Sequence, residues 1–353
     1  MSNTYRVVNW SPSKRVYDLA LTAGIVFYLA IFVVVAKLIW RGDRAMSDPI
    51  LILRALGTCS YLMLHLVLCI GPLARLDRRF LPLLYNRRHL GVATFLIAML
   101  HGLLVLGWYH GFGVVTPFES LLASNTNYTS ITSFPFEMLG IIALAILFLM
   151  AATSHDFWLH NLSPRIWKRL HMMVYVAYFL LVMHVVLGAL YTEKSMVYPV
   201  MTAAGAMVVV TLHLAAGHRE VKRDGAGGAE LHIGWMDVGC VDEIKEGRAI
   251  TACLPGADRV AVYRYGGKIS VVTNQCVHQG GPLGEGKIVG GCVTCPWHGY
   301  QYRPGDGQSP PPFTEKIATY RVKVENRRIL VDVQPLPPGT PVEPATFEEV
   351  ANG

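Results

Sequence analysis

Long apolar runs alternate with short polar connections over the first two thirds of the chain. A helix that spans the hydrocarbon core of a bilayer needs about 20 predominantly apolar residues. Six segments satisfy this requirement, at residues 18–40, 49–73, 89–110, 136–153, 166–191 and 197–217. The first segment lacks a small-residue cleavage site behind its apolar run, so we expect a retained helix rather than a signal peptide. The pattern predicts an all-α transmembrane bundle of six helices.

From about residue 231 the pattern changes to short runs of β-branched and aromatic residues, separated by Gly, Pro and Asp. These runs cover residues 249–252, 259–265, 268–273, 317–324 and 328–333. Alternation with a period of two between turn residues is typical of antiparallel strands. The chain is therefore predicted to be multi-domain, with the helical bundle followed by a small antiparallel all-β domain.

Changes in composition mark the expected domain boundaries. A basic and then Gly-rich stretch after the sixth apolar segment is typical of a flexible link at a membrane surface. The C-terminal residues include many Pro and Glu and few large apolar side chains, which is typical of disorder. The predicted parts are a cytoplasmic N-terminal segment at 1–17, a transmembrane domain at 18–217, a linker at 218–230, a β domain at 231–335 and a disordered tail at 336–353.

The overall composition favours a membrane protein. Hydrophobic residues make up 52% of the chain, and the mean hydropathy of +0.38 is too high for a purely soluble protein. The formal charge is +7, and the basic excess lies in residues 1–230, which contain 19 Lys and Arg against 11 Asp and Glu. Such an excess beside apolar segments indicates membrane orientation and contact with anionic lipid. Nucleic acid is not an expected partner.

Basic residues are distributed unevenly among the connections. Residues 74–88 and 154–170 are rich in Lys and Arg, whereas residues 111–135 contain neither. Because Lys and Arg are enriched in cytoplasmic loops, we expect the two basic connections in the cytoplasm and the third outside. Two arginines in residues 41–48 oppose this orientation. The expected location is a bacterial inner membrane, with both termini and the β domain in the cytoplasm.

Two cysteine–histidine pairs in the predicted β domain have the spacing of a metal site. Cys276 and His278 are followed, after 16 residues, by Cys295 and His298. Two thiolates on one iron and two imidazoles on the other form the [2Fe–2S] arrangement of Rieske proteins. A structural zinc site is the alternative for this donor set, but the flanking Gly and Pro suit two loops that fold tightly over a cluster. The odd total of seven cysteines argues against a disulfide framework.

Residues 233–334 resemble the Rieske ferredoxins of bacterial aromatic-ring dioxygenases. Unlike the Rieske proteins of cytochrome bc complexes, the chain has no extra cysteine after either ligand pair, and Tyr300 replaces a serine that donates to a cluster sulfur there. With fewer hydrogen bonds to sulfur, we expect a potential in the lower part of the Rieske range of about −150 to +300 mV. Cys292 is interpreted as a small buried residue rather than a ligand.

Several histidines lie inside the apolar segments, where an ionisable side chain is a functional candidate by default. His171 and His184 are 13 residues apart, which is about 20 Å along a helix and suits two haems stacked across a bilayer. His101 lies at the depth of His184, and His89 at the depth of His171. The pattern predicts an outer haem on His101 and His184 and permits an inner haem on His89 and His171.

Other histidines compete for these roles. His213 approaches the inner level. His65 lies near the middle of the second segment. Its possible roles are a haem ligand, a proton or quinone site, or a hydrogen-bonded core residue. His89 has an alternative as an interfacial polar residue beside two arginines. We expect the remaining histidines near segment ends to be solvated, namely His110, His155, His160 and His218.

Residues 50–215 resemble the ferric-reductase-like transmembrane family, and within it the haem-binding membrane subunit of the bacterial methionine sulfoxide reductase system. The resemblance rests on residues 86–101, 153–154 and 167–184. It implies b-type haem on His101, His171 and His184. Full ferric reductases place a fourth ligand where this chain has Arg87, so the resemblance implies either one haem or two.

The expected function is transmembrane electron transfer by an oxidoreductase component that needs a separate redox partner. Ferric reductases continue into a flavin- and nicotinamide-binding domain, but this chain has no Gly-x-Gly-x-x-Gly motif. We therefore expect a soluble cytoplasmic electron donor or acceptor, and a quinone or an extracytoplasmic acceptor at the other end. Alternatives are a quinol-oxidising subunit with the β domain as electron outlet, and a non-catalytic redox subunit of a larger complex.

Overall fold

The computed structural model describes most of the chain. The described residues are 12–39, 46–130, 134–154, 158, 162, 164–190, 196–226, 231–232, 234–255, 259–278, 280–297 and 299–347. They form two compact units. The helical unit contains the described residues from 12 to 75 and from 86 to 214, and the β unit contains residues 76–85 and the described residues from 215 onwards.

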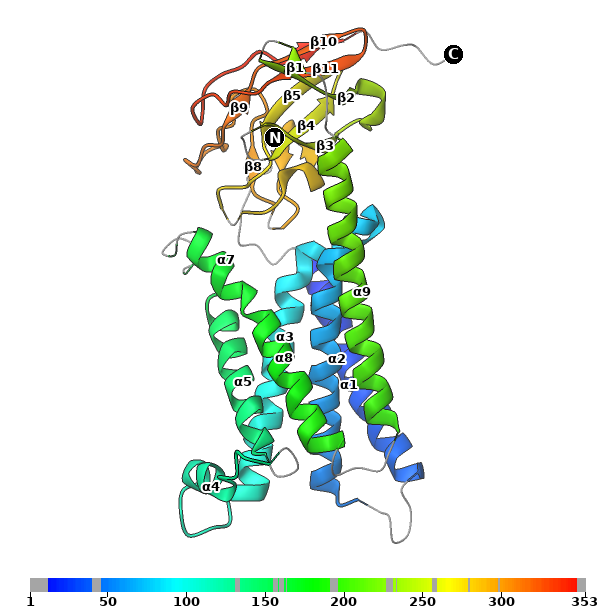
Figure 1. The fold of residues 1–353 in the computed structure, drawn as a ribbon, viewed down its shortest axis with the longest axis vertical. Helices are drawn as coiled ribbons and strands as arrows, with labels where there is room; N and C mark the ends of the chain where they lie inside the picture. Colours follow the sequence, from blue (N-terminus) through cyan, green and yellow to red (C-terminus); the bar gives the residue numbers. More distant parts are fainter. Residues whose placement is uncertain are drawn as a thin grey trace. The chain divides into compact units, whose positions relative to one another are not determined.

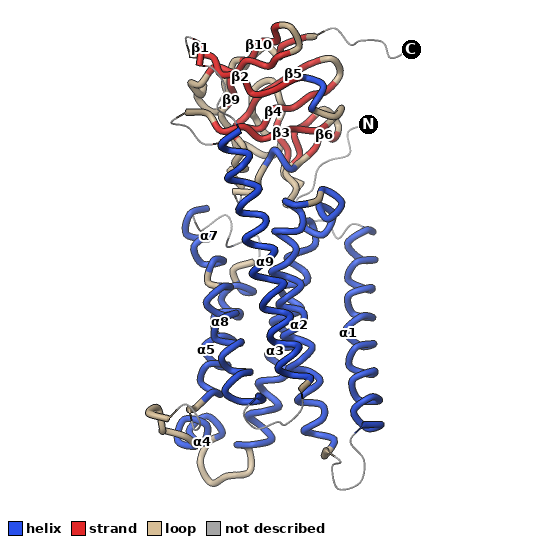
Figure 2. The backbone as a smooth tube through the Cα atoms, turned by 45° about the vertical axis from the view of Figure 1, so that its right-hand side comes forward, coloured by secondary structure: helices blue, strands red, loops and turns tan. Residues whose placement is uncertain are grey.

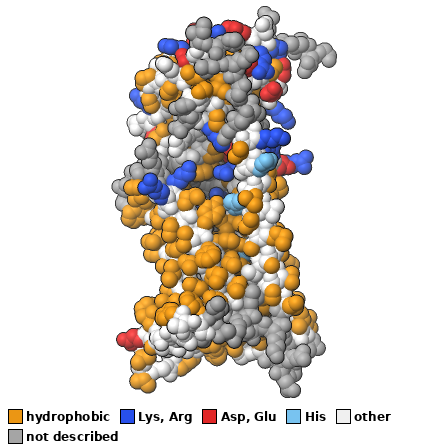
Figure 3. All heavy atoms as spheres, viewed as in Figure 1, with side chains coloured by type: hydrophobic (Ala, Val, Ile, Leu, Met, Phe, Trp, Pro, Cys, Tyr) orange, Lys and Arg blue, Asp and Glu red, His pale blue; other side chains and the backbone are white. Residues whose placement is uncertain are grey.

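The helical unit consists mainly of long helices (Figures 1 and 2). These are α1 (Pro12–Ile39), α2 (Asp48–Leu76), α3 (Leu81–His110), α5 (Phe136–Ala152) and α9 (Val197–Ala226). Shorter helices are α4 (Pro117–Ser124), α7 (Pro164–Met172) and α8 (Val174–Val185). Hydrophobic side chains cover most of the helical surface visible in Figure 3. A helix that is apolar all round is typical of a membrane span.

The predicted count of six spanning helices is not confirmed. Among the described residues, five helices are long and apolar enough to cross a membrane: Arg15–Ile39, Asp48–Leu76, Asn86–His110, Ile166–Gly188 and Tyr198–Lys222. The fourth predicted segment forms α5, which has only 17 residues. Such a helix is about 25 Å long, against a hydrocarbon core of about 30 Å.

The fifth predicted segment is not one continuous α-helix. α7 ends at Met172 and α8 begins at Val174, and a π-helical turn follows at Val186–Leu190. π turns occur frequently at functional sites. The segment therefore carries His171 on α7 and His184 on α8. His184 lies one residue before the end of α8.

The core of the helical unit forms between α2, α5, α8 and α9. Its buried side chains are Leu64, Leu68, Cys69, Ala143, Leu147, Val174, Ala177 and Val209. α5 and α8 run side by side in both ribbon views (Figures 1 and 2). Ala143 on α5 and Ala177 on α8 are fully buried, and small residues of this kind allow membrane helices to approach closely. α5 is thus a packed member of the bundle despite its length.

The described part of the β unit forms three antiparallel sheets, which confirms the predicted antiparallel β domain. The first has the order β1 (Leu231–His232), β2 (Trp235–Cys240), β11 (Arg328–Asp332), β10 (Val322–Glu325). The second has the order β12 (Ala345–Thr346), β5 (Lys268–Thr273), β4 (Arg259–Tyr265), β3 (Arg248–Cys253), and β9 (Thr319–Tyr320) also pairs with β5. The third, β6 (Lys287–Val289), β7 (Cys292–Thr294) and β8 (Gln301–Tyr302), carries one of the two cysteine loops.

Two ends of the predicted domains are more ordered than expected. α9 continues to Ala226, so the predicted linker at 218–230 is helical at its start, where Arg, Glu and Lys are good helix formers. The predicted disordered tail is ordered over residues 336–347, because β12 pairs with the edge of β5. Its main chain is held further by the Val342 amide, which donates to the Gly305 carbonyl at 2.7 Å.

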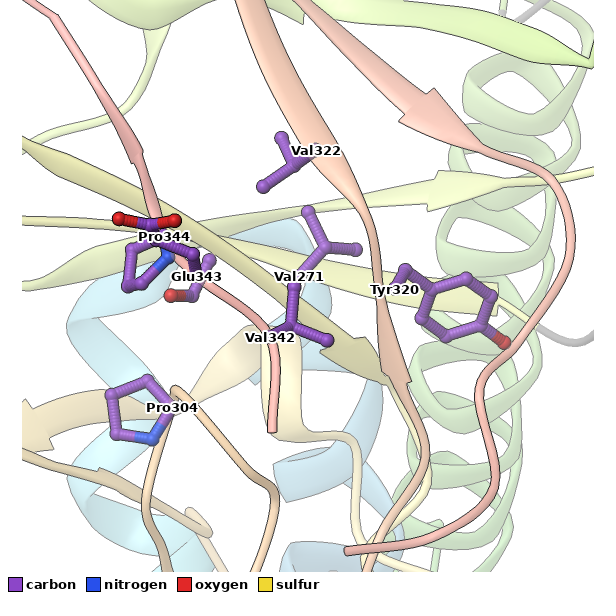
Figure 4. A pocket seen from close by; sticks show the side chains of 8 residues that line it. Val271, Pro304, Tyr320, Val322, Val342, Glu343 and Pro344 are labelled. Atoms are coloured by element: carbon purple, nitrogen blue, oxygen red, sulfur yellow. The ribbon is translucent and has the colours of Figure 1, made fainter. Parts of the chain in front are cut away.

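Figure 4 shows a recess of the β unit that this tail helps to line. The residues that line it are Ser270, Val271, Pro304, Tyr320, Val322, Val342, Glu343 and Pro344. Proline is tolerated at the edge of a sheet, where no ladder hydrogen bond is lost, so composition alone did not reveal this pairing. Residues 348–353 of the predicted tail lie outside the described residues.

Candidate cluster and haem sites

The two predicted cluster cysteines begin loops with the same hydrogen-bond pattern. In each loop the cysteine carbonyl accepts from a glycine amide four residues later: Gly280 donates to Cys276 at 2.6 Å, and Gly299 donates to Cys295 at 2.9 Å. The cysteine amide donates to the carbonyl five residues later, at 2.9 Å in the first loop and 2.8 Å in the second. The φ angles of the two glycines are +71° and +72°, a left-handed conformation that favours glycine. The repeated Cys-x-x-x-Gly sequence thus produces the same turn twice.

The two cysteine side chains are positioned to share one site. Cys276 and Cys295 are each 1% exposed, and neither forms a disulfide. Gly281 in the first loop faces the second, since a Cβ on it would lie 2.7 Å from Cys295 Sγ and 3.2 Å from the Trp297 ring. The missing side chain at this glycine therefore lets the first loop approach the buried thiol of the second loop closely.

The predicted imidazole ligands are only partly described. His278 is partly exposed and stacks on Tyr300, with ring centroids 4.9 Å apart and an angle of 14° between the planes. His298 lies outside the described residues. Within the described ranges, no three His, Cys, Asp or Glu side chains form a closed metal-binding group. The two buried thiols and one imidazole are nevertheless the donor types of a Rieske cluster.

A tyrosine hydroxyl that sequence reasoning missed lies beside the first cysteine. Tyr302 on β8 is fully buried, and its Oη lies 3.3 Å from Cys276 Sγ. Burial raises the pKa of Tyr302, and the neighbouring Cys276 raises it further, so the hydroxyl keeps its proton and can donate to a thiolate. The signal in the sequence was the second aromatic residue, two positions after Tyr300 and close behind the second cysteine–histidine pair.

This hydroxyl changes the argument about the cluster potential. We expected few hydrogen bonds to the cluster sulfurs because Tyr300 stands where a serine donates in other Rieske proteins, and Tyr300 stacks on His278. Tyr302 supplies a hydroxyl on the cysteine side instead. The low potential stays a prediction, and Tyr302 acts against it because a hydrogen bond to sulfur stabilises the reduced state.

His101 on α3 and His184 on α8 have matching environments. The Nδ1 of His101 lies 2.9 Å from the Leu53 carbonyl, and the Nδ1 of His184 lies 2.8 Å from the Phe136 carbonyl. A proton on Nδ1 leaves Nε2 as the nitrogen that binds a metal. In the described part of the chain, neither Nε2 has a hydrogen-bond partner.

A glycine lies beside each of these two rings. A Cβ on Gly57 would lie 3.0 Å from Cε1 of His101, and one on Gly140 would lie 2.9 Å from Cε1 and Nδ1 of His184. The contact at Gly140 is shorter than real Cβ contacts in proteins, and the one at Gly57 would be unusually tight, so each imidazole lies close against a glycine that lacks a side chain. Two oriented imidazoles with available Nε2 atoms fit the axial ligands of a haem.

His171 and His89 are oriented in two different ways. His171 Nδ1 lies 3.0 Å from the carbonyl of Trp167, whose ring stacks on the imidazole at 3.8 Å. Its Nε2 lies 3.4 Å from Ser154 Oγ, which is a long contact. The Nδ1 of His89 lies 2.6 Å from Oδ1 of Asp18, and its Nε2 has no hydrogen-bond partner among the residues described.

His65 and His213 differ from the four predicted ligands in having a tyrosine hydroxyl at Nε2; the Ser154 hydroxyl near His171 instead donates to the Met150 carbonyl at 2.6 Å. Both rings place Nδ1 2.8 Å from the carbonyl four residues earlier. The Nε2 of His65, however, lies 3.1 Å from Tyr178 Oη, and the Nε2 of His213 lies 3.1 Å from Tyr175 Oη. A hydroxyl that donates to Nε2 occupies the nitrogen that would bind iron.

The other sequence candidates fall outside these sites. His110 Nδ1 lies 3.0 Å from Ser120 Oγ at the end of α3, and His155 and His160 lie outside the described residues. Arg87, at the position of the fourth ligand in the family resemblance, lies against α2, 3.7 Å from the site of a Cβ on Gly71. A guanidinium does not ligate iron but binds carboxylates well.

Two family profiles match the chain, one for each unit. The profile described as a ferric reductase like transmembrane component matches residues 56–182, and the profile described as a Rieske [2Fe–2S] domain matches residues 234–321. Both resemblances inferred from the sequence are thereby confirmed.

Individual relatives divide in the same way. The heme-binding subunit of a protein-methionine-sulfoxide reductase from Caulobacter vibrioides is 31% identical over 160 residues, which cover 44% of this chain and 70% of that protein. The ferredoxin component of naphthalene 1,2-dioxygenase and salicylate 5-hydroxylase systems from Ralstonia is 31% identical over 101 residues, which cover 28% of this chain and 96% of that protein. Among solved structures, a Sphingomonas yanoikuyae ferredoxin matches with 26% identity and a TM-score of 0.26, covering 28% of this chain and 96% of its own.

Proposed function

We propose that this chain, which belongs to the ferric reductase like transmembrane family in its helical unit and to the Rieske [2Fe–2S] family in its β unit, relays single electrons across a membrane. The families bring a [2Fe–2S] cluster to the β unit and b-type haem to the helical unit. Each of these groups, when bound, takes up and releases one electron at a time. The chain is an integral membrane protein of electron transport, and the following assignments are proposals.

The state of the histidine Nε2 atoms carries the haem assignment. We assign one haem to His101 and His184 and a second to His89 and His171. Each of these rings is oriented through Nδ1, and an oriented, more basic imidazole is the usual metal ligand. Support for excluding His65 comes from the tyrosine hydroxyl on its Nε2.

The cluster assignment rests on the paired loops. Cys276 and Cys295 are the buried ligands, and His278 and His298 complete the set proposed from the sequence. His278 is partly exposed and follows Val277, which is 44% exposed. Its ring therefore offers a redox partner a short route to the cluster.

In this proposal the β unit lies in the cytoplasm, and electrons flow from a soluble cytoplasmic protein to the cluster, then to the haems, and finally to a quinone or an extracytoplasmic acceptor. The basic connection at 74–88 supports this orientation. Arg87 and Arg88 lie close enough to His171 to act on it electrostatically. Guanidinium groups at that level suit the propionate carboxylates of a haem.

Reduction in membrane vesicles tests the relay. A ferredoxin reductase with NADH is mixed with everted vesicles, and haem reduction is followed by its absorbance in a stopped-flow instrument. We expect Cys295→Ser, which removes a cluster ligand, to slow haem reduction to the rate measured with the parent protein when the ferredoxin reductase is omitted. Cys292→Ser is the matched control, since that thiol is partly buried on β7 and not assigned as a ligand. Unchanged haem reduction in Cys295→Ser, with the cluster absent by EPR, would refute the relay.

The direction of flow has its own measurement. An EPR redox titration of the purified protein gives the potentials of the cluster and of each haem. Flow into the membrane requires that the cluster potential not lie well above the haem potentials. A cluster potential far above both would contradict the proposed direction and favour quinol oxidation with the β unit as the outlet.

A further inference from the structure

An acidic residue in the first membrane helix contacts one of the proposed haem ligands. Asp18 is the only Asp or Glu in α1, and its Oδ1 lies 2.6 Å from Nδ1 of His89 on α3. Both side chains are largely buried, with 28% of Asp18 and 27% of His89 exposed. A carboxylate in a membrane span is costly and is normally retained for a functional reason.

The contact lies at the level of the second haem site. His89 precedes His101 by 12 residues on α3, and His171 precedes His184 by 13. These separations correspond to about 18 Å and 20 Å along a helix, so His89 and His171 lie at a similar depth. α1 thus supplies a charged group at this level, to a ligand on another helix.

The acceptor on His89 differs chemically from those on the other three rings. His101, His171 and His184 place Nδ1 against neutral backbone carbonyls, whereas His89 places it against a carboxylate. A carboxylate draws the Nδ1 proton more strongly, makes Nε2 a stronger donor to iron and favours the ferric state. The two proposed haems would therefore differ in potential even though both have two histidine ligands.

We propose that Asp18 is the positioning residue of the second haem, where it orients His89 and lowers the potential of that haem relative to the one on His101 and His184. The proposal rests on the proposed function in one respect, the assignment of His89 as a ligand. It adds a role for α1, which carries none of the histidines.

Three substitutions separate the charge of Asp18 from its shape. Asp18→Asn keeps an oxygen that can accept from Nδ1 but removes the charge, and Asp18→Ala removes both. Asp48→Asn is the matched control, because Asp48 at the start of α2 also ties a neighbouring helix to α1, through Lys37 Nζ at 2.8 Å. Asp48 is exposed, however, and Lys37 lies near the other end of α1 from Asp18. Each variant is purified in detergent, its haem per chain is measured as the pyridine haemochrome, and its haem is titrated.

We expect Asp18→Asn to keep both haems and to raise the midpoint potential of one of them, while the other stays unchanged. A tenfold loss of preference for the ferric state corresponds to about 59 mV for a one-electron couple. Asp18→Ala should lose about half of the haem, and Asp48→Asn should match the parent in both measurements.

Two results would overturn the proposal. One is an Asp18→Asn variant whose two haem potentials equal those of the parent. The other is a parent protein that binds a single haem and keeps it in His89→Ala. Neither result contradicts the proposed electron relay, which the cluster variant Cys295→Ser tests independently. If instead Cys295→Ser refutes the relay, the shift in Asp18→Asn still establishes the role of Asp18 at the haem.

Discussion

Gly140 gives the outer haem site its most direct test at the scale of a single residue. A Cβ at this position would lie 2.9 Å from the His184 ring, so Gly140→Ala must displace the imidazole that we assign to iron. Disturbing the groups that orient a metal ligand costs about 10- to 100-fold in affinity. We expect less haem per chain in Gly140→Ala, measured as the pyridine haemochrome.

Gly91→Ala is the control for this substitution. Gly91 lies within α3, and nothing is found within 4 Å of the site of its Cβ. Alanine is favoured over glycine in a helix by about 1 kcal/mol, so this variant should fold and bind haem like the parent. A full haem content in Gly140→Ala would show that His184 does not ligate iron.

Tyr302 provides a second test, at the cluster. Its hydroxyl lies 3.3 Å from Cys276 Sγ, and a hydrogen bond to a charged acceptor is worth about 1.5–3 kcal/mol. Since the bond strengthens when the cluster gains an electron, Tyr302→Phe should lower the cluster potential, by roughly 30–65 mV if about half of that energy depends on the redox state. An EPR redox titration measures the change. Tyr265→Phe, which removes a hydroxyl bonded to Ser270 at 2.8 Å, should leave the potential as it was, and an equal shift in both variants would exclude a specific role for Tyr302.

Residue types and their spacing identified the cysteines and histidines as candidates but could not rank the histidines. In the sequence, His65, His101 and His213 all stand as ionisable residues inside apolar runs. They differ in their Nε2 partners: the tyrosines that occupy this atom in His65 and His213 are 113 and 38 residues away in the chain. Such partners depend on how the helices pack, which local pattern does not specify.

At the scale of elements, the tail strand β12 is expected to contribute to the stability of the β unit. Phe347 follows β12, packs on the apolar core and lies under the Arg264 guanidinium, 5.2 Å from its ring centroid. Phe347→Ala should destabilise the β unit by about 1–3 kcal/mol, because the side chain is partly buried. The temperature at which the full chain loses the visible circular dichroism of its cluster reports this change. Val289→Ala, at a 41% exposed site, should alter it much less, and equal stability in Phe347→Ala and the parent would mean that the tail adds nothing.

An ion pair at the β10–β11 turn gives the β unit a pH dependence. Arg327 Nε lies 2.8 Å from Asp242 Oδ2, and this hydrogen bond lowers the pKa of Asp242. A carboxyl whose pKa is lower in the folded state than its unfolded value of about 3.9 stabilises the fold above that pH, and the contribution is lost as the pH falls through the folded pKa. Asp242→Asn should therefore melt at a lower temperature than the parent at neutral pH, with a difference that shrinks below about pH 4. A difference that is independent of pH would contradict this role.

The elements that the sequence located well are those with a strong local signal. An apolar run of about 20 residues matches a bilayer, and an alternating β-branched run matches a sheet with one buried face. Both patterns are local in the sequence, and they form helices and strands near the expected residues. The predictions were wrong or unconfirmed where the structure of a segment depends on a partner far away in the sequence, or where its length is close to the limit for a membrane span. β12 is ordered by the edge of β5, and α5 is short for a span.

At the scale of the whole molecule, α5 decides the sidedness of the relay. With only 17 residues, it lies at the lower limit of lengths that span a bilayer, yet its residues Ala143 and Leu147 are buried in the bundle core. If α5 crosses, the basic connections 74–88 and 154–170 lie on the same side as the β unit. If α5 does not cross, the two basic connections lie on opposite sides of the membrane, which contradicts the usual enrichment of Lys and Arg in cytoplasmic loops. We therefore propose that α5 crosses the membrane.

Labelling with a membrane-impermeant maleimide tests this crossing. Cys240 is partly exposed on β2, and Thr126, which is exposed after α4, is replaced by cysteine. Three membrane passages, by α5, by α7 with α8 and by α9, separate the two positions if α5 crosses, so they must lie on opposite sides. We expect Cys240 to react only in everted vesicles and Thr126→Cys only in right-side-out vesicles. Reaction of both thiols from the same side would leave two passages between them, so α5 would not span and the cluster would lie on the same side as residues 111–135.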